Sequence, residues 1–282
     1  MTNIQLYNKV CFENSKTITE RYSTSFSSAI KLLSKTMHDA IHGIYGFVRL
    51  ADEIVDTFHD ADKENLLAEF KTETYKAIEQ RISLNPVLHA FQLTVHKYQL
   101  EQSLIEAFFK SMEMDLHKSK YTTVAEYNEY IYGSAEVVGL MCLQVFCNGD
   151  KIKYEQLKPS AQALGAAFQK INFLRDVKDD FSQLNRTYFP NVDFNHFDEI
   201  EKQKIVEDIE IDFQNGLKGI SQLPVGSRFG VFVAYKYYYS LFKKIKQLPV
   251  KAIQHERVRV PDFDKVLIIF KSYFRYKFQL LA

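Results

Sequence analysis

Apolar residues recur at three- and four-residue spacing, with few breaks, from Tyr22 to Gln247. This spacing is the period of an amphipathic α-helix, and the two-residue alternation that marks a half-buried strand is nearly missing. Gly and Pro, which interrupt helices, number only 10 and 6 among 282 residues. The pattern therefore predicts an all-α fold.

The turn signals between these segments are short. Asn85-Pro86 ends one segment and starts the next, Thr122-Thr123 can cap a helix, and Asn148-Gly149-Asp150 forms a turn. No stretch reads as an interdomain linker, so we expect one domain over residues 1–282, a bundle of about ten helices. The expected helices are 24–34, 37–58, 61–82, 86–98, 101–118, 123–148, 153–182, 198–221, 225–247 and 262–280. The longest irregular stretch, 185–196, is a candidate lid over a site.

Charge and cysteine content narrow the function. The 36 Lys and Arg against 35 Asp and Glu leave a formal charge of +1, which gives no field for nucleic acid. Cys11, Cys142 and Cys147 form no CxxC pair and are odd in number, which argues against a disulfide framework. The N-terminus lacks signal-peptide regions, and no run approaches 18 uninterrupted apolar residues. We therefore expect a cytoplasmic protein.

The first segment with chemical meaning is IHGIYGFVRLADEIVD at 41–56. At about 100° per residue, Tyr45, Arg49, Asp52 and Asp56 fall within about 60° of one another, beside an apolar stripe. A lone acidic pair of this kind is usually a solvated patch, so this segment alone does not indicate a site.

A second acidic face changes that interpretation. In LGAAFQKINFLRDVKDD at 164–180, Gln169, Asn172, Asp176 and Asp180 again share one side of a helix. Carboxylates four residues apart repel each other, so two such pairs beside apolar stripes indicate a bound cation.

Magnesium suits these residues, because it binds one or two carboxylates and completes its shell with water and phosphate oxygens. No GxxxxGK[ST] or GxGxxG occurs, so side chains must hold the phosphate. Arg49 and Arg175 lie close to the acids, and guanidinium matches phosphate geometry. An interior supplied by 23 Phe and 17 Tyr beside such a rim favours a prenyl diphosphate.

With these residues in view, the chain resembles the squalene/phytoene synthase family from about Tyr22 to Arg259. YSTSF at 22–26 is similar to its N-terminal serine motif, YGFVRLADEIVD at 45–56 to its first aspartate motif, and QKINFLRDVKDD at 169–180 to its second.

Two further segments carry the resemblance. TYFP at 187–190 is similar to the family's tyrosine–proline lid, and YIYGSAEVVGLM at 130–141 to its small-residue helix. Glu136 stands where the family usually has Gly, so either the cavity floor differs there or Glu136 faces away.

The resemblance implies an isoprenoid synthase-type bundle around a central prenyl-binding cavity. It implies catalytic roles for Asp52, Asp56, Asp176, Asp180, Arg49 and Tyr45, and metal ligation by Asp52, Asp56, Asn172, Asp176 and Asp180. Gln169 and Asn172 are implied to assist the metal ligands and to bind substrate. Diphosphate contacts are implied for Ser23, Ser25, Tyr45, Arg49, Arg175, Tyr188, Tyr238 and Arg257. Prenyl contacts are implied for Tyr130, Ser134, Val137 and Met141, which share a helix face and could equally be ordinary core.

The family joins two prenyl diphosphates head to head through a cyclopropylcarbinyl diphosphate. Our first expectation is phytoene from two geranylgeranyl diphosphates in carotenoid biosynthesis, with Mg²⁺ as cofactor and Mn²⁺ as a substitute. One alternative is dehydrosqualene or squalene from farnesyl diphosphate, with NADPH required only for squalene. Another is a non-catalytic assembly factor, against which the intact aspartates argue.

The C-terminal segment has two interpretations. Phe263, Val266, Leu267, Phe270 and Phe274 share one face of the expected helix. They fit either core packing or peripheral membrane contact. The sequence leaves monomer and dimer equally open.

Overall fold

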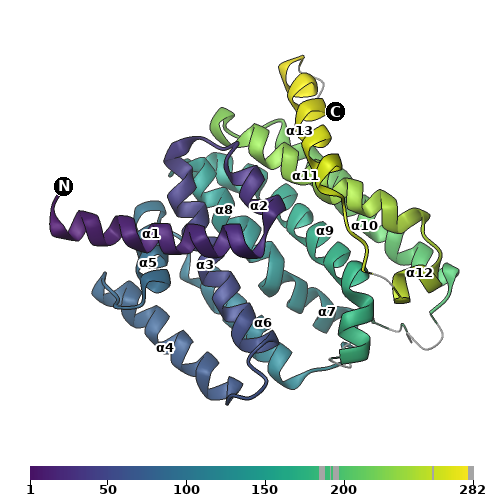
Figure 1. Ribbon diagram of the computed structural model, residues 1–282, viewed down its shortest axis with the longest axis horizontal. Helices are drawn as coiled ribbons and strands as arrows, with labels where there is room; N and C mark the ends of the chain where they lie inside the picture. The colour runs from purple at the N-terminus through teal and green to yellow at the C-terminus, as the bar shows by residue number, and fades with distance from the viewer. Residues whose placement is uncertain (184–187, 191, 193–196, 256, 279–282) are drawn as a thin grey trace.

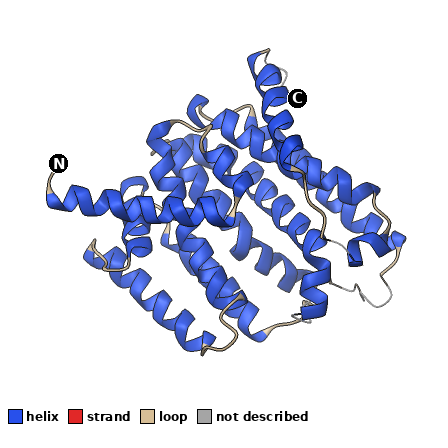
Figure 2. Ribbon diagram, in the orientation of Figure 1, coloured by secondary structure: helices blue, strands red, loops and turns tan. Residues whose placement is uncertain are grey.

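The computed structural model describes residues 1–183, 188–190, 192, 197–255 and 257–278; for 178–183 and 262 only the backbone is described. These residues form helices and no strand (Figure 2), which confirms the all-α prediction. The helices are α1 (Asn3–Tyr22), α2 (Thr24–Ile30), α3 (Lys35–Asp56), α4 (Lys63–Gln80), α5 (Pro86–Tyr98), α6 (Gln102–His117), α7 (Val124–Ile131), the π-helical turn η1 (Tyr132–Glu136), α8 (Val137–Cys147), α9 (Lys151–Gln183), α10 (Glu199–Ile220), α11 (Val225–Gln247), α12 (Val250–His255) and α13 (Asp262–Lys277).

Thirteen α-helices in this part of the chain exceed the ten that periodicity predicted. Two of the additions, α1 and α12, lie where no helix was expected. Helix α1 begins with a capping box, in which Thr2 Oγ1 accepts from Gln5 N at 3.3 Å and Gln5 Oε1 accepts from Thr2 N at 2.8 Å. Its apolar face is weak, so periodicity alone missed it, and α12 is too short to show a period. The single-domain organisation stays a prediction.

The arrangement of the helices places α9 at the centre. Helix α9 packs against α8 and η1 on one side and α10 on the other, while α1 lies across α3 and α5 (Figure 1). One apolar cluster gathers around α9, α10 and α11, and a second around α3, α5, α6 and α8. Val231 of α11 packs against both clusters.

The predicted helix 123–148 is one helical run interrupted by η1. The run Val124–Cys147 is long and apolar enough to cross a membrane, by length and composition only. However, 56% of its 18-residue apolar window is buried within the protein, and the run contacts α3, α6 and α9. We therefore interpret it as a core helix.

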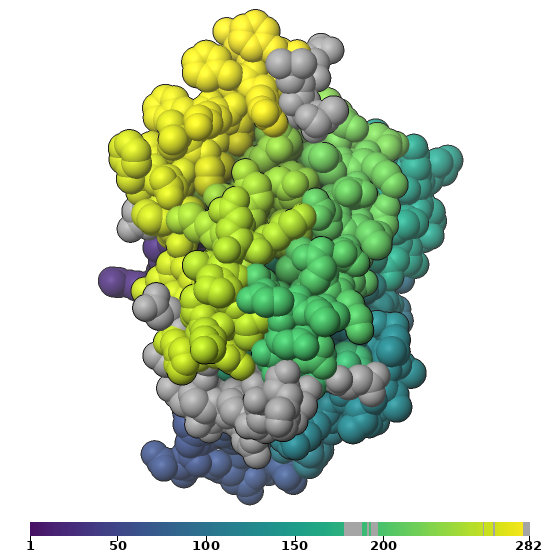
Figure 3. Space-filling view, turned by 90° about the vertical axis from the view of Figure 1, so that its right-hand side faces the viewer, coloured from purple at the N-terminus to yellow at the C-terminus, as the bar shows by residue number. Residues whose placement is uncertain are grey.

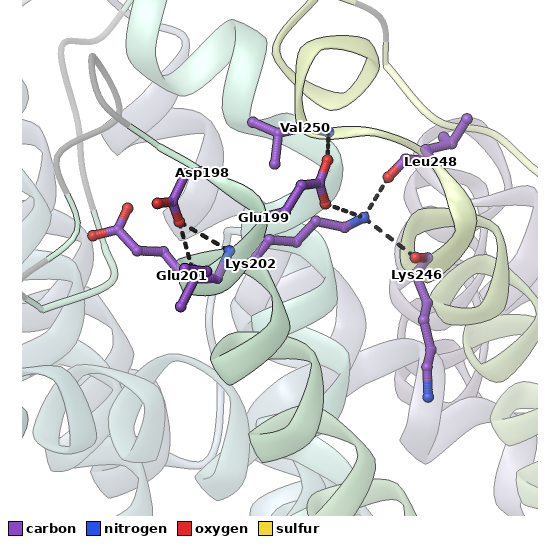
Figure 4. A network of polar contacts seen from close by, with 8 residues as sticks. Asp198, Glu199, Glu201, Lys202, Lys246, Leu248 and Val250 are labelled. Carbon is purple, nitrogen blue, oxygen red and sulfur yellow. Dashed lines mark hydrogen bonds and ion pairs between the residues drawn. The ribbon is translucent and has the colours of Figure 1, made fainter.

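A polar network ties the start of α10 to the connection between α11 and α12 (Figure 4). The Lys202 ammonium, in a side chain that is almost fully buried, donates to the carbonyl oxygens of Lys246 and Leu248. Glu199 Oε1 accepts from Val250 N at 2.7 Å. Because burying an ammonium is costly unless it is hydrogen-bonded, these contacts hold the start of α12 against α10.

His42 makes the stability of this fold depend on pH. Its Nδ1 lies 3.0 Å from Thr19 Oγ1, whose hydroxyl donates to Ser15 O. Burial, assisted by nearby His38, lowers the pKa of His42 to about 4. In the unfolded chain the pKa of His42 is about 6.5, so as pH falls the unfolded chain binds this proton before the folded chain does. Protonation therefore favours the unfolded state and lowers the stability of the fold.

We expect the free energy of unfolding to drop by about 2 kcal/mol from this group between pH 7.5 and 5. Urea denaturation at both pH values measures it. His42→Asn should remove this part of the pH dependence, whereas His117→Asn, at an exposed position, should keep it. An unchanged dependence in His42→Asn would contradict the prediction.

Candidate active site

A cavity of about 540 Å³ lies between α2, α3, η1, α8, α9 and α11. This volume is typical of a small-molecule site. Acidic, basic and hydroxyl side chains line one end of it. Apolar and small residues line the rest, including Leu143, Phe146 and Leu157.

Helix α9 forms one long wall of the cavity. Residues from Leu157 to Asp176 on this helix line it, so the wall extends about 28 Å at the helical rise of 1.5 Å per residue. Gly165 lets the wall approach η1, since a Cβ there would lie 2.9 Å from Ala135 O. A larger residue would push the two helices apart.

On the opposite side, α3 presents Tyr45, Arg49, Asp52 and Asp56 to the cavity. Burial, and then the nearby charge of Asp56, raise the pKa of Asp52 to about 8, although Arg49 lowers it. Burial also raises the pKa of Tyr45 to about 12. A cation bound at the acidic pair would offset both effects that disfavour the charged form of Asp52.

Arg49 is held in place but keeps one free donor. Its guanidinium pairs with Glu53 and lies 4.4 Å from the centre of the Tyr22 ring. Its Nε is buried and has no hydrogen-bond partner among the described residues. A buried donor without a partner is costly, so this group is suited to an anion entering the cavity.

Across the cavity, two guanidinium groups converge on Asp176. Arg175 binds it through two bonds, Nε to Oδ1 at 2.9 Å and Nη2 to Oδ2 at 2.5 Å. Arg257 Nε lies 2.9 Å from Oδ1, although the two residues are far apart in sequence. Both arginines line the cavity, so guanidinium and carboxylate groups lie together on this wall.

Aromatic rings cover the cavity between these polar groups. Tyr188 stacks on Phe173 at 4.0 Å between ring centres, and Tyr238 stacks on Phe168 at 3.9 Å. All four rings line the cavity. Ring faces of this kind attract positive charge.

The squalene/phytoene synthase family model matches residues 19–264, which is most of the chain. The chain belongs to this family. The family resemblance inferred from the motifs is therefore confirmed.

Relatives agree with this membership. The chain is 26% identical to a phytoene synthase of Arthrospira platensis over 283 residues, 92% of this chain and 91% of the relative. It is also 26% identical to a 4,4'-diapophytoene synthase of Staphylococcus haemolyticus over 198 residues, 67% of each chain. The family and these relatives support a prenyltransferase-type enzyme that condenses prenyl diphosphates head to head.

Solved structures confirm the isoprenoid synthase fold. A dehydrosqualene synthase with bound ligand superposes with a TM-score of 0.81 at 20% identity, covering 97% of this chain and 98% of that one. A squalene synthase of Alicyclobacillus acidocaldarius gives 0.73 at 20% identity, covering 86% and 95%.

Most of the residues that family resemblance singled out line this cavity. They are Ser23, Tyr45, Arg49, Asp52, Asp56, Tyr130, Ser134, Gln169, Asn172, Arg175, Asp176, Tyr188, Tyr238 and Arg257. Their roles in this squalene/phytoene synthase family member stay predictions. The side chain of Asp180 and most of the candidate lid at 185–196 lie outside the described residues.

Three candidates lie elsewhere. Val137 and Met141 are fully buried in the core and, like Ser25, are not among the described residues that line the cavity. Their expected face assumed an unbroken α-helix, but η1 adds one residue to its turn and rotates everything after it. Val138 and Cys142 line the cavity in their place.

Glu136, which departs from the family pattern, faces away from the cavity. Its Oε2 accepts from Gln162 Nε2 at 2.9 Å, and burial raises its pKa. Of the two alternatives for this position, the structure therefore supports the second.

The sequence motifs assign no role to Tyr22 and Asp115, both of which line the cavity. Tyr22 covers Arg49, and the buried Asp115 accepts from Tyr130 Oη at 2.6 Å. Tyr22 is the first residue of the serine motif at 22–26, but its contact with Arg49 is formed only in the folded chain. No sequence motif marks Asp115 as a site residue, because it lies on α6, outside all of the motifs.

The donor set fits a hard divalent cation. Asp52, Asp56 and Asp176 offer carboxylate oxygens, and Asn172 Oδ1 is buried with no hydrogen-bond partner in the described chain. Within that part of the chain, no three His, Cys, Asp or Glu side chains are close enough to hold one ion alone. Magnesium prefers oxygen donors of this kind, binding one or two carboxylates and completing its shell with phosphate oxygens and water.

Proposed function

We propose that this chain joins two geranylgeranyl diphosphates head to head to form phytoene, with magnesium as its cofactor. One observation carries the proposal: Asp52 and Asp56 on α3 and Asp176 on α9 line the same cavity, whose apolar wall extends about 28 Å along α9. Such a site can hold a charged diphosphate at one end and a long hydrocarbon at the other.

Asp52, Asp56, Asn172, Asp176 and, by the motif, Asp180 would hold the magnesium. When bound, magnesium would supply positive charge to the diphosphate as it departs.

The arginines would bind and orient the diphosphate oxygens. Arg49 has an unused Nε donor, while Arg175 and Arg257 could exchange Asp176 for phosphate. Preorganised cations at a departing oxyanion lower the barrier, because negative charge grows there in the transition state.

The aromatic and apolar residues would protect the allylic cation that remains. Phe168, Phe173 and Tyr188 present ring faces, which stabilise positive charge and leave little room for water. The second prenyl diphosphate attacks this cation through its double bond and loses a proton as the cyclopropane ring closes. The cyclopropylcarbinyl diphosphate that forms then releases its own diphosphate, and the resulting cation rearranges and loses a second proton.

Chain length is the finer part of the proposal. With carbon–carbon bonds of about 1.5 Å, an extended geranylgeranyl chain spans about 19 Å and a farnesyl chain about 14 Å. The cavity wall accommodates either. The phytoene synthase relative, aligned over 92% of this chain, supports the longer substrate.

The alternative is condensation of two farnesyl diphosphates to dehydrosqualene, or to squalene with NADPH. It is favoured by the similarity to a 4,4'-diapophytoene synthase and by the TM-score of 0.81 to a dehydrosqualene synthase.

Incubation of the purified protein and magnesium with each diphosphate, with and without NADPH, tests these proposals. Mass spectrometry of the hydrocarbon identifies the product. Phytoene supports the first proposal, a C30 product moves the assignment to the alternative, and no product from either substrate favours an assembly factor.

A further inference from the structure

Helix α13 turns its apolar side chains outward. Phe263, Phe270 and Phe274 are 79%, 62% and 58% exposed. The other large apolar residues exposed on or next to this helix are Val266, Leu267, Tyr273 and Phe278. The helix forms a ridge at one edge of the molecule, drawn in yellow in Figure 3.

The polarity of this helix is inverted. Ser272 is 2% exposed and lies on the buried side, and Tyr273 and Tyr276 contact Phe229 of α11. At about 100° per residue, Phe263, Phe270 and Phe274 lie opposite Ser272. A helix on a water-exposed surface normally presents polar residues there. The exposed face of α13 is therefore built to meet something apolar.

Basic residues adjoin this face. Lys271 and Arg275 lie along one edge of α13, and Lys236 of α11 is close both to Arg275 and to Lys243 of its own helix. Burial, and then these neighbouring charges, lower the pKa of Lys236 to about 8. Among the described residues, none of Lys236, Lys243 and Arg275 forms an ion pair with a carboxylate. Like charges gathered without acidic partners attract an anionic surface.

A second copy of the chain meets these features poorly. A two-fold interface places the same patch against itself, so the cations of α11 and α13 would lie close to their own copies. The acid on this helix whose contacts are described, Asp264, already pairs with Lys244 at 3.4 Å. An anionic bilayer offers both an apolar interior for the phenylalanines and phosphates for the cations.

We propose that the exposed face of α13, with Lys236 and Lys243 of α11, is a docking surface for an anionic lipid bilayer. Docking would turn one side of the cavity toward the lipid. Helix α13 packs on α11 and reaches α2 through Lys265 Nζ, 3.0 Å from Thr24 Oγ1, and both α2 and α11 line the cavity. The inference does not depend on which prenyl diphosphate is used.

Co-sedimentation of the full chain with vesicles tests the proposal. We expect binding to vesicles of phosphatidylglycerol and phosphatidylcholine, much weaker binding to pure phosphatidylcholine, and release at high salt. Phe270→Ser/Phe274→Ser and Lys271→Gln/Arg275→Gln should each weaken partitioning by about tenfold or more. The matched control is Leu84→Ser/Ile152→Ser, which alters two apolar residues that are even more exposed and lie elsewhere on the molecule; this variant should bind like the parent.

Thermal unfolding shows whether each variant is folded. If a double variant has a lowered melting temperature, one of its two substitutions is tested alone. Three results would overturn the proposal. The first is equal vesicle binding by all four proteins, and the second is binding by none of them. The third is a dimer, detected by sedimentation without lipid, that Phe270→Ser/Phe274→Ser dissociates; this would identify a second copy as the occupant.

Discussion

Replacing Asp52 by asparagine is expected to lower turnover at least about 100-fold while the fold is kept. The amide has nearly the shape of the carboxyl but cannot supply the negative charge that holds a cation opposite the diphosphate. Because burial and Asp56 already disfavour the charged form of Asp52, the neutral side chain should not destabilise the metal-free protein. Asp176→Asn should lower turnover similarly.

Diphosphate release at saturating magnesium measures this loss, and the melting temperature with and without magnesium measures binding separately. The parent should be stabilised by the ion, and Asp52→Asn should lose most of that shift. Asp39→Asn is the matched control, because Asp39 is exposed on the same helix. Most of the activity surviving in Asp52→Asn would refute the assigned role.

Replacing Phe47 by alanine is expected to cost about 3–5 kcal/mol of the free energy of unfolding. Phe47 is 0% exposed, and its ring stacks on Phe91 with 3.9 Å between centres. It also contacts Phe70, Phe108 and Phe109, so four helices lose packing when the ring is removed.

Urea denaturation measures this change. Phe263→Ala, at an exposed position, should stay within about 0.5 kcal/mol of the parent. At a temperature where Phe47→Ala is folded, its turnover should be close to that of the parent, since Phe47 does not line the described cavity. A loss below about 1 kcal/mol would show that this aromatic cluster repacks.

The candidate site was predictable where its signal was local. Arg49, Asp52 and Asp56 could be assigned to one helix face because their spacing and the helical period are both visible in a single segment. Asp115 and Tyr22 were missed as contributors because their importance comes from what they touch, Tyr130 and Arg49. Neither partner is adjacent to them in sequence.

Helical periodicity did not predict which residues after Tyr132 line the cavity. Gly133 lies so close to α6 that a Cβ there would be 2.4 Å from Ala107 O. At this contact the helix adopts the π turn, which exchanges Val137 and Met141 for Val138 and Cys142 at the cavity wall. One extra residue in a single turn changes the spacing of apolar residues very little, so the sequence does not reveal the π turn.

By itself, the sequence determined the helical class, most helix positions, the family and the two acidic faces, because each depends on residues within a few turns of one another. Only the tertiary structure decided that α3 and α9 face each other across one cavity, that Arg257 reaches Asp176, and that Glu136 points away. It also decided that the apolar face of α13 is exposed. These features depend on how helices that are distant in sequence pack against one another. The spacing of apolar residues shows which side of a helix is apolar, but it does not show which part of the protein, if any, covers that side.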